Sequence, residues 1–239
     1  MNTSKVASFR DRLVKSVSKT IVGKDSAIDS VAFAILGGGH ILFEDNPGLG
    51  KTTLAKAVAK AMGCEFKRIQ FTADLLPADV TGTFVLTGND EFKFVKGPIF
   101  TQILLADEIN RAPPKTQSAL LEAMQERQVT SENHTFKLPH PFVVLATQNP
   151  IEYEGTYPLP EAQMDRFCAR IRIGYPSDED ELKILGMRRS IDDELKDVVK
   201  VADPEDILGL QAELEDLYVD DDVKRIGRAS CRERVYVLV

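Results

Sequence analysis

The sequence lacks the features that would place it in several specialised classes of protein. It has three cysteines, Cys64, Cys168 and Cys231, and no CxxC pair, so their spacing indicates neither a disulfide framework nor a zinc site. The longest apolar runs, such as residues 31–36 and 103–106, are far shorter than the roughly 20 residues that cross a bilayer. The N-terminus also lacks the apolar core of a secretory signal. We therefore expect a cytoplasmic protein that is not inserted in a membrane.

The chain has no excess of positive charge either. Its formal net charge of −7 argues against a sequence-independent grip on nucleic acid or anionic lipid, because both depend on dense Lys and Arg surfaces. Its histidines, His40, His134 and His140, lack metal-ligand spacing and are expected at strand ends or on the surface. With 239 residues, the chain is long enough for one large α/β domain and a fragment of a second.

Short apolar runs alternate with helical patterns along most of the chain. The predicted strands cover residues 40–43, 66–71, 102–106, 142–147 and 169–173. The predicted helices cover residues 4–18, 25–36, 115–126 and 160–166, and a further helix begins at Lys51. Such alternation predicts an α/β fold, with a mainly parallel sheet and helices on both of its faces.

Two segments with a period of two interrupt this alternation. Residues 82–95, turning at 87–90, and residues 128–138, turning near Glu132-Asn133, are both predicted to be β-hairpins inserted into the core. We expect three aromatic residues of the first insert to be packing residues: Phe92, Phe94 and Phe100.

The chain changes character after residue 175, where it becomes acidic and helical. Ser177 and Asp178 are the candidate N-caps of a helix predicted over residues 179–189. We divide the chain into an N-terminal helix (1–20), a core (21–175), a partial helical lid (176–225) and a tail (226–239). The tail, IGRASCRERV and the last four residues, resembles the translation of a sequencing adapter, so we expect it to be non-native, the alternative being a native basic tail.

A phosphate-binding loop is predicted between the first strand and the helix that begins at Lys51. The segment Asn46-Pro47-Gly48-Leu49-Gly50-Lys51-Thr52 would turn backbone N–H groups and a helix N-terminus towards phosphate oxygens. Lys51 would reach the β- and γ-phosphates, and Thr52 would ligate Mg²⁺. Asp45 replaces the first glycine of the usual pattern, and we expect the loop geometry to survive this change because Asp tolerates unusual backbone angles. An incidental glycine-rich turn is the alternative.

Two acids follow the buried strand at residues 102–106. Asp107 would hold Mg²⁺ through its water shell, and Glu108 would orient and polarise the attacking water. Two acids after an apolar strand are most often a solvated loop, but a phosphate-binding loop about fifty residues upstream makes this pattern a Walker B motif.

Two further polar residues are candidates for the site. Asn149 follows the strand at 142–147 and is placed to report on the γ-phosphate, although Asn-Pro is also a routine turn. Arg166 lies near the end of a short helix that begins at a proline, and it is a candidate arginine finger. The alternative for Arg166 is a salt bridge with Asp165 or Glu161.

Together, the segments NPGLGKTTLAKA, ILLADEINRAPPKTQSALLEAMQE and VLATQNPIEYEGTYPLPEAQMDRF resemble the MoxR family of AAA+ ATPases, over about residues 20–190. The resemblance implies a P-loop NTPase sheet, with the two hairpins as the helix-2 and pre-sensor-1 inserts, and a hexameric ring with ATP at subunit interfaces. It makes Asn149 sensor 1 and Arg166 the arginine finger. It also places Val22 and Gly23 at the adenine pocket and extends the nucleotide-binding segment to Thr53.

The resemblance further implies a magnesium-dependent ATPase that acts as a chaperone-like remodeller, often with a von Willebrand factor A domain partner. A nucleic-acid motor is the alternative, since helicase rings share both inserts. The charges of the hairpins argue against this alternative. The positive charges of Lys93 and Lys96 are offset by Asp90 and Glu91, and that of Lys137 is offset by Glu132. A third alternative is a nucleotide-gated switch with negligible turnover. It is disfavoured because Glu108, the residue predicted to polarise the attacking water, is present. No residue matches the sensor 2 arginine of the family's lid, so we expect the lid to be truncated and nucleotide binding to be weaker than in a complete homologue.

Overall fold

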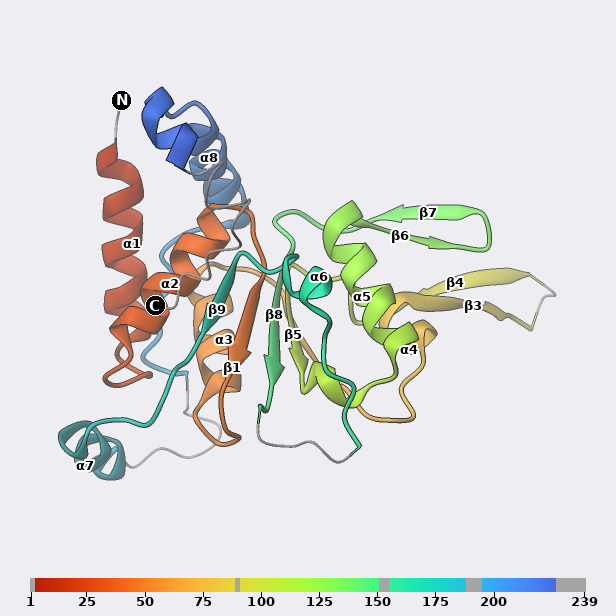
Figure 1. The fold of residues 1–239 in the computed structure, drawn as a ribbon, viewed down its shortest axis with the longest axis horizontal. Helices are drawn as coiled ribbons and strands as arrows, with labels where there is room; N and C mark the ends of the chain where they lie inside the picture. Colours follow the sequence, from red (N-terminus) through yellow and green to blue (C-terminus); the bar gives the residue numbers. More distant parts are fainter. Residues whose placement is uncertain (1–2, 89–90, 151–154, 188–194, 227–239) are drawn as a thin grey trace.

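The computed structural model describes residues 3–88, 91–150, 155–187 and 195–226. A sheet of five parallel strands lies at its centre, in the order β2-β5-β8-β1-β9 (Figure 1). The strands are β1 (Ile41–Glu44), β2 (Phe66–Gln70), β5 (Ile103–Asp107), β8 (Val143–Gln148) and β9 (Ala169–Ile171). This arrangement confirms the predicted parallel sheet, and it brings the carboxyl ends of all five strands to one edge.

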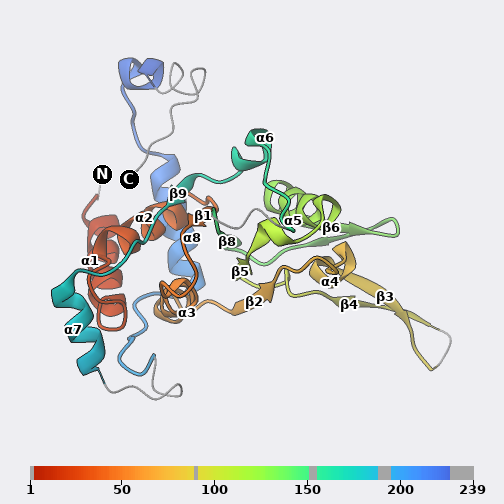
Figure 2. The ribbon, with the colours of Figure 1, turned by 60° about the horizontal axis from the view of Figure 1, so that its bottom comes forward.

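Helices cover both faces of the sheet, because successive residues of each inner strand are buried on opposite sides. On β5, Ile103 and Leu105 join one hydrophobic cluster, and Leu104 and Ala106 join the other. The first cluster is closed by α1 (Thr3–Val17), α2 (Asp25–Leu36), α3 (Lys51–Ala61) and α8 (Pro204–Glu215). The second is closed by α4 (Pro77–Thr81), α5 (Pro114–Glu126) and the two hairpins. The two groups of helices are separated in both ribbon views (Figure 2).

His40 fixes the start of β1, the strand that leads into the glycine-containing turn before α3. Its Nδ1 accepts a hydrogen bond from the backbone N–H of Val144 at 3.0 Å, so the proton lies on Nε2, which donates to the carbonyl oxygen of Met124 at 3.1 Å. Burial lowers the pKa of His40 to about 4, which keeps the ring neutral. The predicted strand-end histidine is therefore a buried link between β1, β8 and α5.

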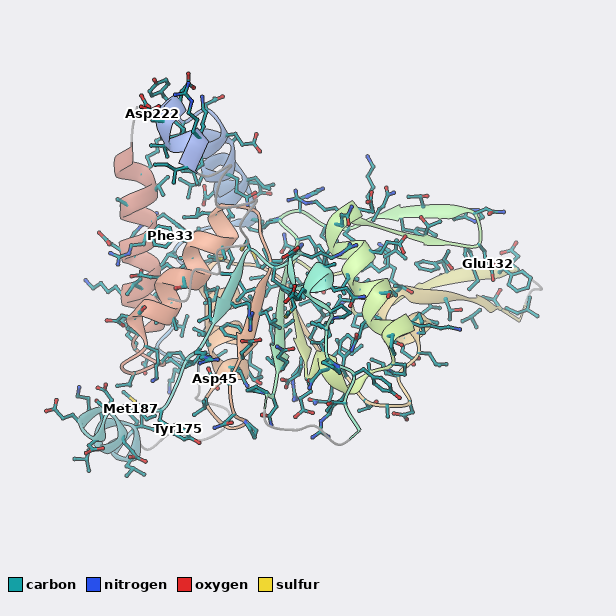
Figure 3. The ribbon with its side chains drawn as sticks, in the orientation of Figure 1. Phe33, Asp45, Glu132, Tyr175, Met187 and Asp222 are labelled. Atoms are coloured by element: carbon teal, nitrogen blue, oxygen red, sulfur yellow. The ribbon has the colours of Figure 1, made fainter. Side chains whose placement is uncertain are left out.

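The two predicted hairpins are present and pack against each other. One pairs β3 (Gly82–Leu86) with β4 (Phe92–Lys96), and the other pairs β6 (Gln128–Ser131) with β7 (His134–Lys137). Phe94 and Phe136 stack with ring centroids 4.0 Å apart, and Phe84 contacts both rings. Figure 3 places Glu132 at the turn of the second hairpin.

The expectation that Phe92 is a packing residue is wrong, because its side chain is 70% exposed. Phe92 pairs with Leu86 at the outer end of the first hairpin, beyond the cross-strand pair Phe84–Phe94 that packs on the second hairpin. Phe94 and Phe100 do pack, edge to face, at the inner end.

The residues after 175 divide between an exposed helix and one that joins the core. Helix α7 (Asp178–Gly186) is capped by Ser177, whose Oγ accepts from the N–H of Asp180 at 3.2 Å. Figure 3 shows Tyr175 and Met187 beside this helix, away from the sheet. In contrast, Ile207 of α8 is fully buried in the cluster of α1–α3. The helix predicted over residues 179–189 ends earlier, at Gly186, because Met187 has an extended backbone conformation. Residues 188–189 of that prediction lie outside the described residues, as does the tail apart from Ile226. The boundaries at 20, 175 and 225 stay predictions.

Among the helices of the described part of the chain, none is long and apolar enough to span a membrane.

Candidate nucleotide-binding site

A cavity of about 300 Å³ opens at the carboxyl edge of the sheet. Its walls come from the turn between β1 and α3, from the ends of β2, β5 and β8, and from the residues that follow them. The predicted site residues that line it are Pro47, Gly48, Gly50, Lys51, Thr52, Asp107, Glu108 and Asn149. Sheet order explains this meeting, because β1 and β5 flank β8 and end at the same edge.

The turn before α3 encloses open space. Gly48 and Gly50 have φ of 85° and 77°, and a Cβ added to either would meet no atom within 4 Å. Glycine adopts these left-handed angles without strain, whereas a residue with a side chain would be strained there. Helix α3 begins at Lys51, directly after the turn, and its first N–H groups have no partner within the helix. The turn therefore leaves room for phosphate groups next to a helix end of partial positive charge.

The Lys51 ammonium is buried inside this turn. Its Nζ donates to the carbonyl oxygens of Asp45 at 2.7 Å and Asn46 at 3.1 Å. Burial lowers the pKa of Lys51, while the nearby carboxylates, led by Asp45, act in the opposite direction. The loop itself thus holds the cation close to the cavity.

Asp45, which stands where the usual pattern has glycine, ties the loop to the last strand of the sheet. Its Oδ2 accepts hydrogen bonds from the backbone N–H groups of Ile173 and, at 3.3 Å, Gly174. Both residues follow β9, so this carboxylate joins the entrance of the loop to the chain that leads towards α7. The substitution supplies a cross-link that glycine could not make.

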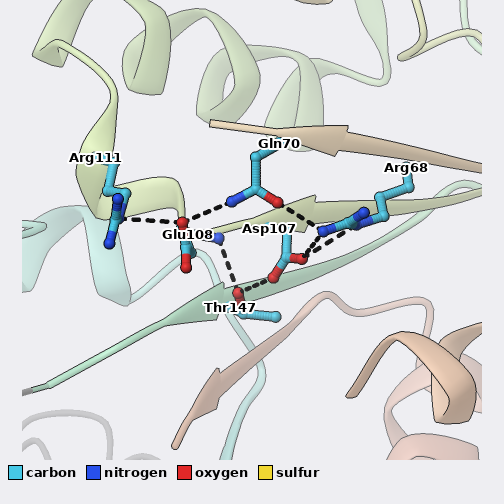
Figure 4. A network of polar contacts seen from close by, with 6 residues as sticks. All are labelled: Arg68, Gln70, Asp107, Glu108, Arg111 and Thr147. Atoms are coloured by element: carbon cyan, nitrogen blue, oxygen red, sulfur yellow. Dashed lines mark hydrogen bonds and ion pairs between the residues drawn. The ribbon is translucent and has the colours of Figure 1, made fainter. Parts of the chain in front are cut away.

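Thr147 joins the two acids at the end of β5. Its Oγ1 donates to Asp107 Oδ1 at 2.6 Å and accepts from the backbone N–H of Glu108 at 2.8 Å (Figure 4). The Thr147 side chain is almost fully buried, so these bonds are shielded from water. Glu108 has φ of 56° and ψ of 50°, a left-handed conformation that is strained for a non-glycine residue. Strain of this kind is concentrated at functional sites.

Arg68 and Gln70, at the end of β2, also contact the acids, and the sequence reasoning missed both. Arg68 donates from Nε and Nη2 to Asp107 Oδ2, at 3.1 and 2.7 Å, and Nη2 also donates to Gln70 Oε1 at 2.7 Å. Gln70 Nε2 donates to Glu108 Oε2 at 2.6 Å, and Arg111 Nε lies 3.1 Å from the same oxygen. The one signal in the sequence is that Arg68 and Gln70 are two residues apart in a predicted strand, which puts both on one face.

The cavity has the ligands that Mg²⁺ prefers. The Thr52 hydroxyl and the Asp107 carboxylate both line it, and Mg²⁺ binds hard oxygen donors, usually one or two from protein and the rest from phosphates and water. The open space around Gly48 and Gly50 leaves room for those phosphates.

The remaining predicted site residues lie outside the cavity lining. Asn46, Leu49 and Thr53 belong to the loop and the first turn of α3, next to the lining residues. Gly23 lies against Asp180 of α7, as a Cβ built on Gly23 would clash with the Asp180 carboxylate, and Val22 precedes it.

Arg166 lies beyond α6 (Glu161–Met164), and its Nη1 donates to the carbonyl oxygen of Leu121 on α5 at 3.0 Å. An arginine finger acts on the site of a neighbouring subunit, and exposure of Arg166 is compatible with that role.

The parallel sheet, the loop before α3 and the two acids at the same edge define a P-loop nucleotide-binding protein. Residues 40–169 match the model of the ATPase family associated with various cellular activities (AAA). The chain belongs to the MoxR family of these AAA+ ATPases.

Three similar proteins support this assignment. Uncharacterized protein YeaC of Bacillus subtilis is 51% identical over 89% of this chain, and Chaperone MoxR1 of Mycobacterium tuberculosis is 51% identical over 73% of it. A crystal structure of a candidate ATPase from Cytophaga hutchinsonii has a TM-score of 0.80 and 42% identity, and it covers 93% of this chain. The chain spans 67% of YeaC, 47% of MoxR1 and 68% of the C. hutchinsonii protein.

Proposed function

We propose that this protein hydrolyses ATP with Mg²⁺, and that a hexameric ring of subunits uses the reaction to remodel partner proteins in the cytoplasm. One observation carries the proposal: Lys51 and Thr52 share a single cavity with Asp107 and Glu108, although about fifty residues separate the two pairs in sequence. This is the set of groups that P-loop ATPases use to bind a triphosphate, hold a metal and position water.

Each group has a distinct part in the proposed reaction. The loop amides and Lys51 would bind the phosphates, and Thr52 and Asp107 would hold Mg²⁺, which neutralises charge on the β- and γ-phosphates when bound. Glu108 would orient the attacking water and accept its proton, while Thr147 keeps the Glu108 backbone fixed relative to Asp107. Asn149 would contact the γ-phosphate, and Arg166 would reach the site of the next subunit.

A protein substrate is favoured over nucleic acid. The described residues of the two hairpins include Lys93, Lys96 and Lys137, but also Glu91 and Glu132, so they do not form the dense basic surface that phosphate binding needs. The name of the similar protein Chaperone MoxR1 also supports a chaperone-like role. We further propose a partner with a von Willebrand factor A domain.

Substitution of Glu108 tests the proposed chemistry. We expect Glu108→Gln to bind Mg·ATP with near wild-type affinity but to hydrolyse it at least about 100-fold more slowly, because the amide cannot accept the proton of water. Calorimetry measures the binding, and phosphate release measures the rate. Glu122→Gln, an exposed change on α5, is the matched control and should hydrolyse normally.

Substitution of Lys51 gives the complementary result. Lys51→Ala should lose binding of Mg·ATP altogether. Hydrolysis at the wild-type rate by Glu108→Gln, or intact binding by Lys51→Ala, would contradict the proposed site. Stimulation of hydrolysis by DNA and not by a candidate partner protein would favour the nucleic-acid motor instead.

A further inference from the structure

Arg68 lines the same cavity as Asp107 and pairs with its carboxylate. The Thr147 hydroxyl donates a hydrogen bond to Asp107 Oδ1, and two N–H groups of Arg68 donate to Asp107 Oδ2 (Figure 4). Both oxygens of the metal-binding acid are therefore engaged in the structure, one by a buried hydroxyl and the other by a cation. The Asp107 side chain is 15% exposed, so this guanidinium compensates a carboxylate that is largely removed from water.

A guanidinium and a metal would compete for the Asp107 carboxylate. Both carry positive charge, and the repulsion between them is weakly screened because the site is partly buried. Thr147 is held in place by the strand and by the N–H of Glu108, so it cannot yield easily. Arg68 is the partner that can move.

The position of Arg68 allows such movement. It lies on β2, the edge strand of the sheet, and its side chain is 46% exposed, so it can rotate into solvent without repacking the core. Its second contact, with Gln70 Oε1, is also at the surface of the site. In contrast, Arg170 on the opposite edge strand pairs with the buried Glu44 and is less exposed.

We propose that Arg68 is a positioning residue that holds Asp107 in the metal-free site and gives way when a metal–nucleotide complex binds. Arg68 thereby sets how strongly nucleotide binding depends on Mg²⁺. In the absence of metal, Arg68 reduces the repulsion between Asp107 and the phosphates. When the metal is present, Arg68 competes with Mg²⁺ for Asp107. This inference rests on the proposed function, because it requires the site to bind a nucleotide.

The test compares nucleotide affinity with and without metal. A fluorescent, non-hydrolysable ATP analogue is titrated in Mg²⁺ and in EDTA, and the ratio of the Kd in EDTA to the Kd in Mg²⁺ is determined. Loss of Arg68 should weaken binding in EDTA and remove the competitor in Mg²⁺, so both effects raise the ratio. For Arg68→Gln we expect an increase of about two- to fivefold over wild type, the range of partly exposed ion pairs.

Two variants separate this role from a general effect of charge or stability. Lys67→Gln removes the same charge from the neighbouring position of β2, where the Lys67 side chain is 39% exposed and points to Glu65 and the carbonyl of Phe100, so its ratio should match wild type. Arg68→Lys keeps a cation but not the paired N–H contacts, so its ratio should lie between those of wild type and Arg68→Gln. A purely structural role would change both affinities equally and leave the ratio unaltered.

The wild-type protein gives an independent measurement. The Nε–H resonance of Arg68, assigned by its loss in Arg68→Lys, should shift when the Mg²⁺-bound analogue saturates the site. A ratio for Arg68→Gln equal to wild type, or an Nε–H resonance unmoved at saturation, would overturn the inference. Wild type that fails to bind the analogue in Mg²⁺ would instead refute the proposed function.

Discussion

The buried His40 predicts a specific loss of stability in mild acid. The folded protein keeps this imidazole neutral, with a pKa of about 4, whereas the unfolded chain would have the ordinary value of about 6.5. Between these values the unfolded state binds more protons than the folded state. The free energy of unfolding therefore falls as the pH falls from about 6.5 towards 4, and the contribution of His40 is fully present above that window.

The size of the effect follows from the two pKa values. Each unit of difference is worth roughly 1.4 kcal/mol, so the full loss is about 3 kcal/mol by pH 4. Between pH 7.5 and pH 5, linkage gives a loss of about 2 kcal/mol from His40 alone. Burial is the main cause of the low pKa, and the bond that Nδ1 accepts from Val144 requires this ring nitrogen to be unprotonated.

Urea denaturation of wild type and His40→Asn at both pH values measures this contribution. Asn can keep an acceptor towards Val144 and does not titrate, so it loses the bond to Met124 equally at each pH. The stability advantage of wild type over His40→Asn should shrink by about 2 kcal/mol on going from pH 7.5 to pH 5. An advantage that stays constant across this range would refute the assignment of a neutral, buried His40.

Two other side chains give predictions that differ between close variants. Asp45→Ala removes an acceptor from two backbone N–H groups after β9, so it should lower the free energy of unfolding by about 2–3 kcal/mol, whereas Asp45→Asn keeps an acceptor and should cost about 1 kcal/mol. Equal losses in urea denaturation would show that the cross-link is unimportant. Thr147→Val preserves shape but leaves the N–H of Glu108 without its partner beside the buried side chain at position 147, and we expect a loss of about 1–3 kcal/mol together with slower ATP hydrolysis. Thr147→Ser should restore both, and phosphate-release rates that are equal in Val and Ser variants would argue against the bridge.

The sequence predicted the sheet, both hairpins and the helices α1, α2, α3 and α5, because each has a strong local signal. Helix α4 was not predicted, and α8, in the segment assigned to a lid, packs on the core. Apolar runs bounded by turn residues located the five strands. The meeting of Lys51 with Asp107 also followed from the sequence, since parallel strands end at one edge of a sheet.

Contacts that depend on strand order were not predictable in the same way. Arg68 and Gln70 reach the acids because β2 pairs with β5 and brings Gln70 opposite Asp107, and no local pattern gives that pairing. The role of Asp45 depends equally on β9 lying beside β1. The prediction that Phe92 packs was wrong for a related reason. An aromatic side chain usually packs, but the place of Phe92 at the outer end of the hairpin leaves it in solvent.

The stacked rings of Phe94 and Phe136 have a mechanical consequence. They join two hairpins whose roots lie in different parts of the chain: the first hairpin follows β2 through α4, and the second follows β5 through α5. If the base of either hairpin tilted, the two hairpins would therefore move together as one rigid unit. The exposed apolar pair Leu86–Phe92, at the outer end of the first hairpin, would then be displaced farther than the residues near the base.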